Sequence, residues 1–259
     1  MNIRITYINT ATIIIDINGY RLITDPVFDE AGHTYHFGFG TISKKTENPA
    51  FQMDEIGNID MVLLSHHQHE DNLDIKGKEF IKSVKEVIST KSAAKKFSNV
   101  IGLDDWESIH IVTDKVKGLK ITAVPAQHHP WWLPEFFSGK VIGFIIECEE
   151  QDDGVIYISG DTVYFSGIEK IAKKYKIETA IIHVGSAQFR YLTGFGRYTF
   201  NAKEAIKAVE LLKPTKVIPI HYDGWTHFKE KINVAKKHFQ SSSINEKVIW
   251  LEKGKETLL

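Results

Sequence analysis

Short runs of hydrophobic residues alternate with polar positions along most of the chain. The first clear pattern is "TIIIDINGYRLITDP", in which two runs of β-branched residues flank Asn18-Gly19. An Asn-Gly pair between such runs is the strongest short-range signal for a β-hairpin, because both residues tolerate the positive φ angles of a type I′ turn. The sequence therefore predicts a sheet that begins with antiparallel strands.

Further strands and helices are predicted downstream, and they alternate in part. The strand-like runs cover residues 59–65, 86–90, 109–112, 119–125, 141–147, 155–159, 179–184, 216–220 and 247–251. The amphipathic, lysine-rich stretches cover residues 75–84, 92–97, 167–175, 201–212, with Asn201 as N-cap, and 229–239. This mixture predicts an α/β (α+β) fold in which two sheets are sandwiched between helices. With no linker or repeat, residues 1–259 are expected to form one domain.

One long segment lacks any period. Residues 27–52, "VFDEAGHTYHFGFGTISKKTENPAFQ", combine glycine, aromatic residues and two histidines. Structureless loops of this length are usually functional or disordered. We expect this loop to form a lid or a wall of the substrate site.

Charge and composition exclude some functions. The chain of 259 residues has 32 basic and 33 acidic side chains, a net charge of −1, which gives no electrostatic footprint for nucleic acid or an anionic membrane. The N-terminus lacks a secretory signal, and no apolar run is long enough to span a bilayer. We therefore expect a cytoplasmic protein that acts on a small-molecule substrate and binds neither a membrane nor nucleic acid. The sequence leaves open whether the chain forms a homo-oligomer.

Four strand-like runs end in residue types that bind metals. The residues concerned are His66, His67, His69 and Asp71 after the first run, His128 and His129 after the second, Asp161 after the third, and His221 and Asp223 after the fourth. Strand ends on one edge of a sheet share a crevice, where α/β proteins place their sites. Imidazole suits zinc, iron or copper, and carboxylates add harder ligands. The recurrence predicts a metal site.

Alternation within the first cluster selects particular residues. His67, His69 and Asp71 occupy every second position, so an extended or tightly turned segment brings them together, while His66 and Glu70 point elsewhere.

The motif series resembles a known family. In order, "HHQHEDNLD", "AQHH", "SGDT" and "PIHYDGW" are similar to the motifs of the metallo-β-lactamase-fold hydrolases, with the closest likeness to the stand-alone branch that includes ascorbate-6-phosphate lactonase-like proteins. The resemblance covers most of the chain and implies a four-layer αββα sandwich. It also implies that His67, His69 and His128 bind a first metal, that Asp161 bridges two metals, and that Asp71 and His221 bind the second.

Asn72 departs from this family pattern. The usual series is His-x-His-x-Asp-His, and Asn72 stands where the last histidine would bind the second metal. An amide oxygen is a weaker ligand, so the second site binds loosely, takes a harder ion such as manganese, or is lost. Alternatively, Asn72 caps a helix that begins near Leu73. One or two divalent ions are thus expected, zinc first, with manganese or iron as alternatives.

Hydrolysis follows as the expected reaction. A metal lowers the pKa of a bound water towards neutrality and supplies hydroxide without an activated side chain. The chain contains neither a Gly-x-Ser-x-Gly elbow nor a P-loop. The substrate is expected to be a small lactone, ester or phosphodiester, and Asp71 is expected to orient the hydroxide and accept a proton.

Four further residues are candidates with competing interpretations. His183 either faces the same crevice or, as the favoured alternative, lies in the core or beside a metal ligand. Trp131 fits an apolar pocket wall, with core or subunit packing as the alternative. Arg190, together with Arg197, fits an anion-binding loop or an ordinary surface salt bridge.

Other functional classes also have to be weighed. An RNA-processing nuclease of the same superfamily would usually carry basic or accessory segments, which this chain lacks. A diiron oxidoreductase resembles His-x-Glu-x-Asp, whereas this chain has His67-Gln68-His69. A non-catalytic, metal-stabilised binding or regulatory protein remains open because of Asn72.

Overall fold

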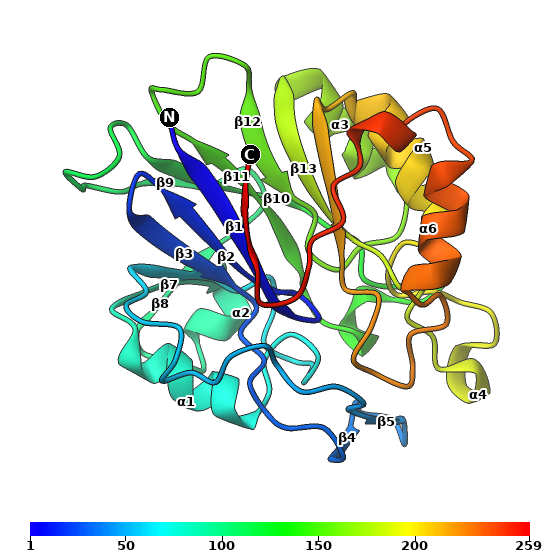
Figure 1. Cartoon of the computed structure of the whole chain (residues 1–259). Coiled ribbons are helices and arrows are strands. Elements are labelled where there is room, and N and C mark those ends of the chain that lie inside the picture. The colour runs from blue at the N-terminus through cyan, green and yellow to red at the C-terminus, as the bar shows by residue number, and fades with distance from the viewer.

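Two β-sheets pack face to face, with helices on both outer sides, in a computed structural model that describes residues 1–259 (Figure 1). The first sheet has the order β15-β1-β2-β3-β6-β7-β8 and the second the order β14-β13-β12-β11-β10-β9. This arrangement confirms the predicted four-layer αββα sandwich.

The elements have the following bounds. The first sheet consists of β1 (Ile3–Asn9), β2 (Thr12–Ile17), β3 (Tyr20–Thr24), β6 (Met61–Leu63), β7 (Glu86–Thr90), β8 (Val100–Leu103) and β15 (Glu256–Leu258). The second consists of β9 (Ser108–His110), β10 (Lys120–Pro125), β11 (Ile142–Glu147), β12 (Val155–Ile158), β13 (Ile177–His183) and β14 (Lys216–Ile220). The helices are α1 (Ile75–Ser83), α2 (Lys91–Ala94), α3 (Ser166–Lys174), α4 (Arg190–Thr193), α5 (Ala202–Leu212) and α6 (Ile232–Gln240), with 3₁₀ turns at Glu135–Phe137 and Asn245–Lys247.

The predicted hairpin is confirmed as β2 and β3. Ile17 pairs with Tyr20 across the turn, and Asn18 and Gly19 both have positive φ angles, of 50° and 87°. These are the angles that the Asn-Gly pair supplies at little steric cost. The hairpin thus fixes the register at the start of the first sheet.

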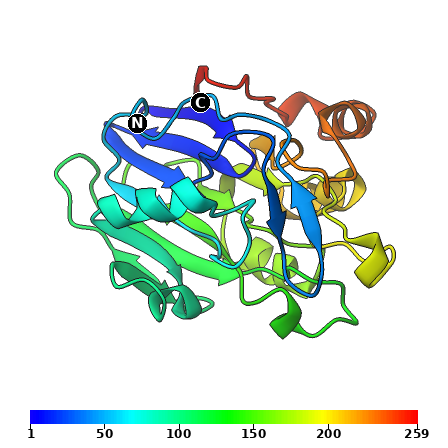
Figure 2. The same ribbon diagram turned by 90° about the horizontal axis from the view of Figure 1, so that it is seen from below.

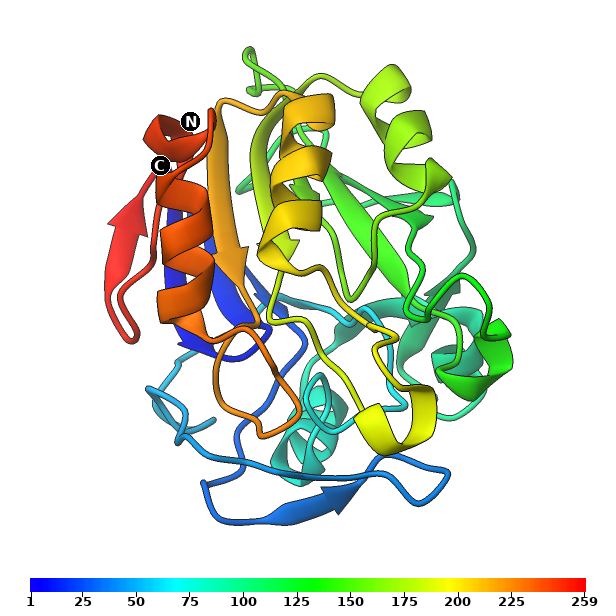
Figure 3. The same ribbon diagram turned by 90° about the vertical axis from the view of Figure 1, so that its right-hand side faces the viewer.

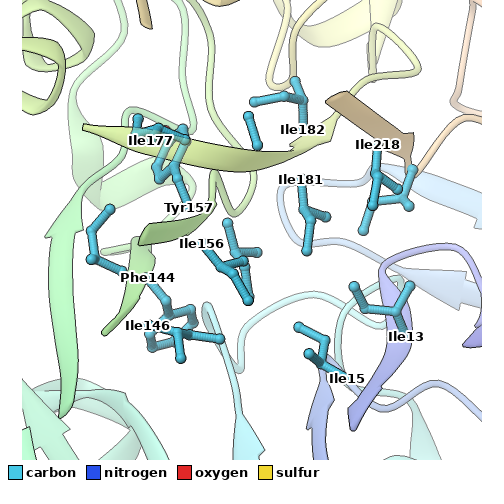
Figure 4. Packing of buried hydrophobic residues seen from close by; sticks show 14 of the residues in the cluster. Ile13, Ile15, Phe144, Ile146, Ile156, Tyr157, Ile177, Ile181, Ile182 and Ile218 are labelled. Carbon is cyan, nitrogen blue, oxygen red and sulfur yellow. The ribbon is translucent and has the colours of Figure 1, made fainter. Parts of the chain in front are cut away.

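Isoleucine-rich faces of the two sheets form the main core. Figure 4 shows Ile13 and Ile15 of β2 opposite Ile156 and Ile181 of the second sheet. All four side chains are fully buried. Since each buried aliphatic side chain contributes about 1.5–3 kcal/mol, this contact between layers is a major source of stability.

The helices are placed by local signals and by their apolar faces. α3, α5 and α6 lie side by side over the second sheet (Figure 3). Asn201 caps α5 as predicted: its side chain accepts a hydrogen bond from the backbone of Glu204, and the Glu204 carboxylate reaches back to the Asn201 N–H. This capping box satisfies two otherwise unpaired donors.

Some expectations about elements were wrong. Residues 247–251 form no strand, since Val248 makes only an isolated bridge to Val217. Three strands that the pattern did not mark, β1, β8 and β15, complete the first sheet. Pairing partners far away in sequence, rather than local alternation, decide these cases.

Loops from both sheets gather at one edge of the sandwich. The parallel strands β12, β13 and β14 end there, as does β6 of the other sheet. The long segment 27–52 reaches the same edge and contains a small hairpin of β4 (Thr34–His36) and β5 (Ile42–Lys44); α4 lies nearby (Figures 1 and 2). None of the helices combines the length and apolar character that crossing a bilayer requires.

Candidate metal centre

The histidine and aspartate side chains that could bind a metal lie at, or just after, the ends of strands at this edge of the sandwich. His183 is the last residue of β13, His221 directly follows β14, and Asp161 and His128 come three residues after β12 and β10. His221 has a φ angle of 65°, in the left-handed region. A non-glycine residue there costs about 1–3 kcal/mol, a strain typical of functional sites.

Three histidines form the first group. The Nδ1 atom of His69 lies 3.1 Å from the Nε2 atom of His66 and 3.1 Å from the Nε2 atom of His128. The ligand atoms of these three residues lie within 4.8 Å of one another. The group therefore has the donor set and compactness of a metal site.

Hydrogen bonds and burial prepare these imidazoles for metal binding. His128 donates its Nδ1–H to the backbone oxygen of Tyr198 at 2.8 Å, which leaves a lone pair on Nε2, and Nδ1 of His66 lies 2.9 Å from the Ser65 hydroxyl. Burial lowers the pKa of all three histidines, that of His69 to about 4. Neutral rings anchored in this way are the form that binds a cation.

The structure corrects one member of the expected set: His66, not His67, joins His69 and His128. The chain is not extended here: it bends at Ser65, His67 and Gln68, so that residues three apart meet, and Nε2 of His66 lies 3.1 Å from Nδ1 of His69. His67 instead points its ring edge-on towards Phe97, with centroids 5.9 Å apart.

Asp161, His183 and His221 form the second group, and all three are fully buried. Asp161 Oδ1 lies 2.9 Å from Nδ1 of His183 and 3.4 Å from Nε2 of His221. The other oxygen, Oδ2, lies 3.8 Å from Nδ1 of His128, so Asp161 stands between the two groups. The bridging role of Asp161 stays a prediction.

The buried carboxylates of Asp161 and Asp71 favour a positive charge at the second group. Burial favours neutral His221, but the carboxylates of Asp161 and Asp71 outweigh it and raise its pKa to about 9. Burial would raise the pKa of Asp161, yet His221, His183 and His128 hold it well below its usual range. Two buried carboxylates that remain ionised need a cation close by.

Asp71 is held by a histidine that sequence reasoning missed. His227 Nε2 lies 3.0 Å from Oδ2 of Asp71, and His227 Nδ1 lies 2.6 Å from the Ser43 hydroxyl. His221 Nε2 lies 3.5 Å from the same Asp71 oxygen. The spacing of His227, six residues beyond His221, belongs to no motif used above; its only sequence signal is its position in the same post-strand loop.

Asn72 does not cap a helix. Its amide N–H donates to the Ser65 hydroxyl at 3.4 Å, and its buried Oδ1 atom has no hydrogen-bond partner. The N-cap of α1 is Asp74, whose carboxylate accepts from the Gly77 N–H at 2.8 Å. The capping interpretation of Asn72 was therefore wrong.

Unpaired buried atoms show that the site fits a cation. Among the buried side-chain atoms without a hydrogen-bond partner, four belong to Asp71 and the second group: Asp71 Oδ1, Asp161 Oδ2, His183 Nε2 and His221 Nε2. Buried polar atoms are nearly always paired, so a cluster of orphans needs an explanation. Imidazoles and carboxylates at one spot are the donor set that zinc, iron or manganese takes, and a metal ion would replace the proton that the raised pKa leaves on His221.

An aromatic cavity leads to this centre. It is bounded by Phe37, Phe39, Thr41, His69, Asp71, His128, Phe137, Ser138, Ala187, Phe189, Leu192, Tyr198 and His227. Phe37 stacks on His69 with centroids 5.7 Å apart, and Phe189 stacks on His227 at 5.1 Å. No lysine or arginine lines the cavity. The segment 27–52 thus supplies part of the wall, through Phe37, Phe39 and Thr41.

Trp131 and Arg190 lie outside this cavity. Trp131 is 87% exposed and borders a separate hollow with Trp132 and Phe195. Arg190 is exposed and donates to the Gln188 side chain at 3.3 Å. Arg197 pairs with Glu204 at 2.6 Å, the salt bridge named as its alternative.

Fold and site together define a metallohydrolase-type protein, and comparison with known families agrees. Residues 20–222 match the model of the Beta-lactamase superfamily domain. The chain therefore belongs to the beta-lactamase superfamily, which confirms the superfamily predicted from the motifs; the lactonase-like branch stays a prediction.

Curated relatives are similar over much of their length. A metal-dependent hydrolase of Methanopyrus kandleri is 28% identical over 255 residues, 97% of each chain. A metal-dependent hydrolase of Pyrococcus horikoshii is 30% identical over 183 residues, 70% of this chain and 75% of the relative. The chain is thus a member of a family of metal-dependent hydrolases.

Solved structures share the fold. An isothiocyanate hydrolase from Delia radicum gut bacteria superposes with a TM-score of 0.81 at 20% identity and covers 98% of both chains. A metallo hydrolase from Ignicoccus hospitalis has a TM-score of 0.71 at 20% identity over 100% of this chain and 99% of its own.

Proposed function

We propose that this protein hydrolyses a small, neutral, largely apolar lactone or ester with the help of divalent cations bound at the edge of the sandwich. The observation that carries the proposal is the aromatic cavity that opens onto His69, Asp71 and His128 and is lined by no lysine or arginine. Apolar pockets with a few convergent polar groups are the usual form of small-molecule sites.

The residues of the centre have distinct roles in this proposal. His66, His69 and His128 would hold one cation, and Asp161, His221 and Asp71 would hold a second, with zinc expected first because imidazole dominates the donor set. A bound cation of this kind activates water near neutral pH and polarises a carbonyl oxygen. Asp71 would orient the attacking water and accept its proton, while His227 keeps the carboxylate in place.

Cavity chemistry favours a neutral substrate over a phosphodiester. A phosphodiester carries a permanent negative charge, which proteins commonly meet with arginine or lysine, and neither lines the cavity. The isothiocyanate of the structural neighbour is also a small neutral electrophile, so it belongs in the substrate panel.

A substrate panel tests the proposal. Zinc-loaded protein is assayed with an aryl ester, an aliphatic lactone, an aryl isothiocyanate and a nitrophenyl phosphodiester of similar size. We expect turnover of at least one neutral substrate, with kcat/KM at least ten times that for the phosphodiester. Preference for the phosphodiester would overturn the substrate class, and no turnover by fully metal-loaded protein would favour a binding or regulatory role.

A nuclease is the less favoured enzyme function. The aromatic cavity is lined by no lysine or arginine, and the chain has a net charge of −1. Neither feature favours binding of a polyanionic backbone. The expected cytoplasmic location stays a prediction, as does oligomerisation.

A further inference from the structure

The second metal site lacks the ligand that its sequence motif should supply. Asn72 occupies the position of that histidine; its amide N–H donates to the Ser65 hydroxyl, and its Oδ1 atom has no hydrogen-bond partner. An amide oxygen is a neutral and weaker ligand than imidazole. A stronger donor elsewhere in the fold would complete the set of Asp161, His221 and Asp71.

We propose that His183, from the end of β13, replaces the missing histidine as a protein ligand of the second metal. The inference rests on the metal centre proposed above but not on its substrate.

Strand topology places His183 for this role. β12, β13 and β14 are neighbouring parallel strands, and His183 pairs in register with Ile220, the residue before His221. The two imidazoles stack with centroids 5.3 Å apart and 13° between their planes. Asp161, His183 and His221 thus come from the carboxyl ends of three adjacent strands, with ligand atoms within 4.8 Å of one another.

Burial and hydrogen bonding support the same assignment. His183 is fully inaccessible to solvent, and its Nε2 atom has no partner. Its Nδ1 atom lies 2.9 Å from Asp161 Oδ1, the only polar side-chain contact of the ring.

A positioning role is the competing explanation. His183 could donate Nδ1–H to Asp161 and merely orient that carboxylate, as outer-shell partners of metal ligands commonly do. The two roles differ in one respect: only a ligand forms a bond to the metal. The two roles can therefore be distinguished by replacing His183 with a side chain whose bond to a metal has its own spectroscopic signal.

The first experiment counts metals. Wild type, His183→Ala and the control His67→Ala are stripped with chelator, reloaded with zinc and measured by elemental analysis, with circular dichroism to verify folding. We expect two equivalents in wild type and His67→Ala but one in His183→Ala, with the affinity for the second zinc lowered at least about 10-fold. Two equivalents with unchanged affinity in His183→Ala, or only one in wild type, would overturn the proposal.

The second experiment tests for the bond. His183→Cys is loaded with Co²⁺ and its near-ultraviolet absorption is compared with that of cobalt-loaded wild type, in which Cys148 is the only thiol. We expect a thiolate-to-cobalt charge-transfer band that appears with the second equivalent. A folded variant that binds cobalt without this band would assign His183 to positioning. Neither experiment measures hydrolysis. If wild type binds two metals but hydrolyses no substrate, the proposed function fails while the assignment of His183 is unaffected.

Discussion

Adjacent histidines in this chain occupy very different environments. His66 is fully buried and lies with His69 and His128, whereas His67 is half-buried against Phe97. Sequence alternation favoured His67, but the bends at Ser65, His67 and Gln68 place His66 beside His69 instead. The two residues therefore form a matched pair for mutation.

His66→Ala should lose the first metal and His67→Ala should keep it. Loss of an outer partner already costs about 10–100-fold in metal affinity, so loss of a ligand should cost at least about 100-fold. Zinc affinity is measured by competition with a chromophoric chelator. Equal affinities in the two variants would contradict the turn geometry, and weaker binding only in His67→Ala would restore the original alternation.

His227→Ala tests the support of Asp71. The variant removes the 3.0 Å contact with Oδ2 and should lower kcat by about 10–100-fold with a smaller change in KM, since Asp71 acts on the attacking water rather than on substrate binding. Ser43→Ala, which removes the partner on the other ring nitrogen, should show the same effect more weakly. A change confined to KM would instead make His227 a substrate contact.

At the scale of elements, a buried ion pair connects the segment 27–52 to helix α1. Lys45 Nζ lies 3.0 Å from Oδ2 of Asp74, and both side chains are inaccessible to solvent. Asp74 also caps α1 and accepts from the Asp29 N–H at 2.6 Å. The loop that carries Phe37 to the cavity is thus tied to the N-terminus of α1.

Lys45→Met should destabilise the protein by about 3–5 kcal/mol, because it leaves the Asp74 carboxylate buried without its cation. Urea unfolding measures the change in the free energy of unfolding. Lys91→Met is the control, since its pairs with Asp104 and Glu107 are exposed, and it should leave the free energy of unfolding nearly unchanged. Similar losses in both variants would refute the argument from burial.

At the scale of the whole molecule, the metal centre joins parts of the chain that only the fold brings together. Its ligands run from His66 to His221 and come from both sheets. An unfolded chain cannot assemble this set, so metal binds the native state and stabilises it.

Metal removal should therefore lower the melting temperature. Zinc at about 1,000 times its Kd contributes about 4 kcal/mol, which corresponds to roughly 10 °C for a chain of this size. Differential scanning calorimetry of chelated and reloaded protein measures the shift, and Asp161→Ala should show less of it. A melting temperature indifferent to zinc would mean that these residues hold no metal.

The sequence by itself determined the elements whose signals are local. Asn18-Gly19 set the hairpin, Asn201 set the start of α5, and apolar runs at 86–90 and 216–220 became β7 and β14 with those bounds. Turn and capping preferences act over three or four residues, so a linear pattern reveals them. Polar residues after strand ends likewise revealed where the site lies, and the motif order revealed the family.

Tertiary structure alone decided which of these residues meet. The bends between Ser65 and Gln68 placed His66 rather than His67 beside His69. The alignment of β13 with β14 brought His183 beside His221, and a distant loop brought His227 to Asp71. β1, β8 and β15 became strands because neighbouring strands offered hydrogen-bond partners. Such contacts depend on the packing of segments far apart in sequence, and no period or motif within one segment encodes them.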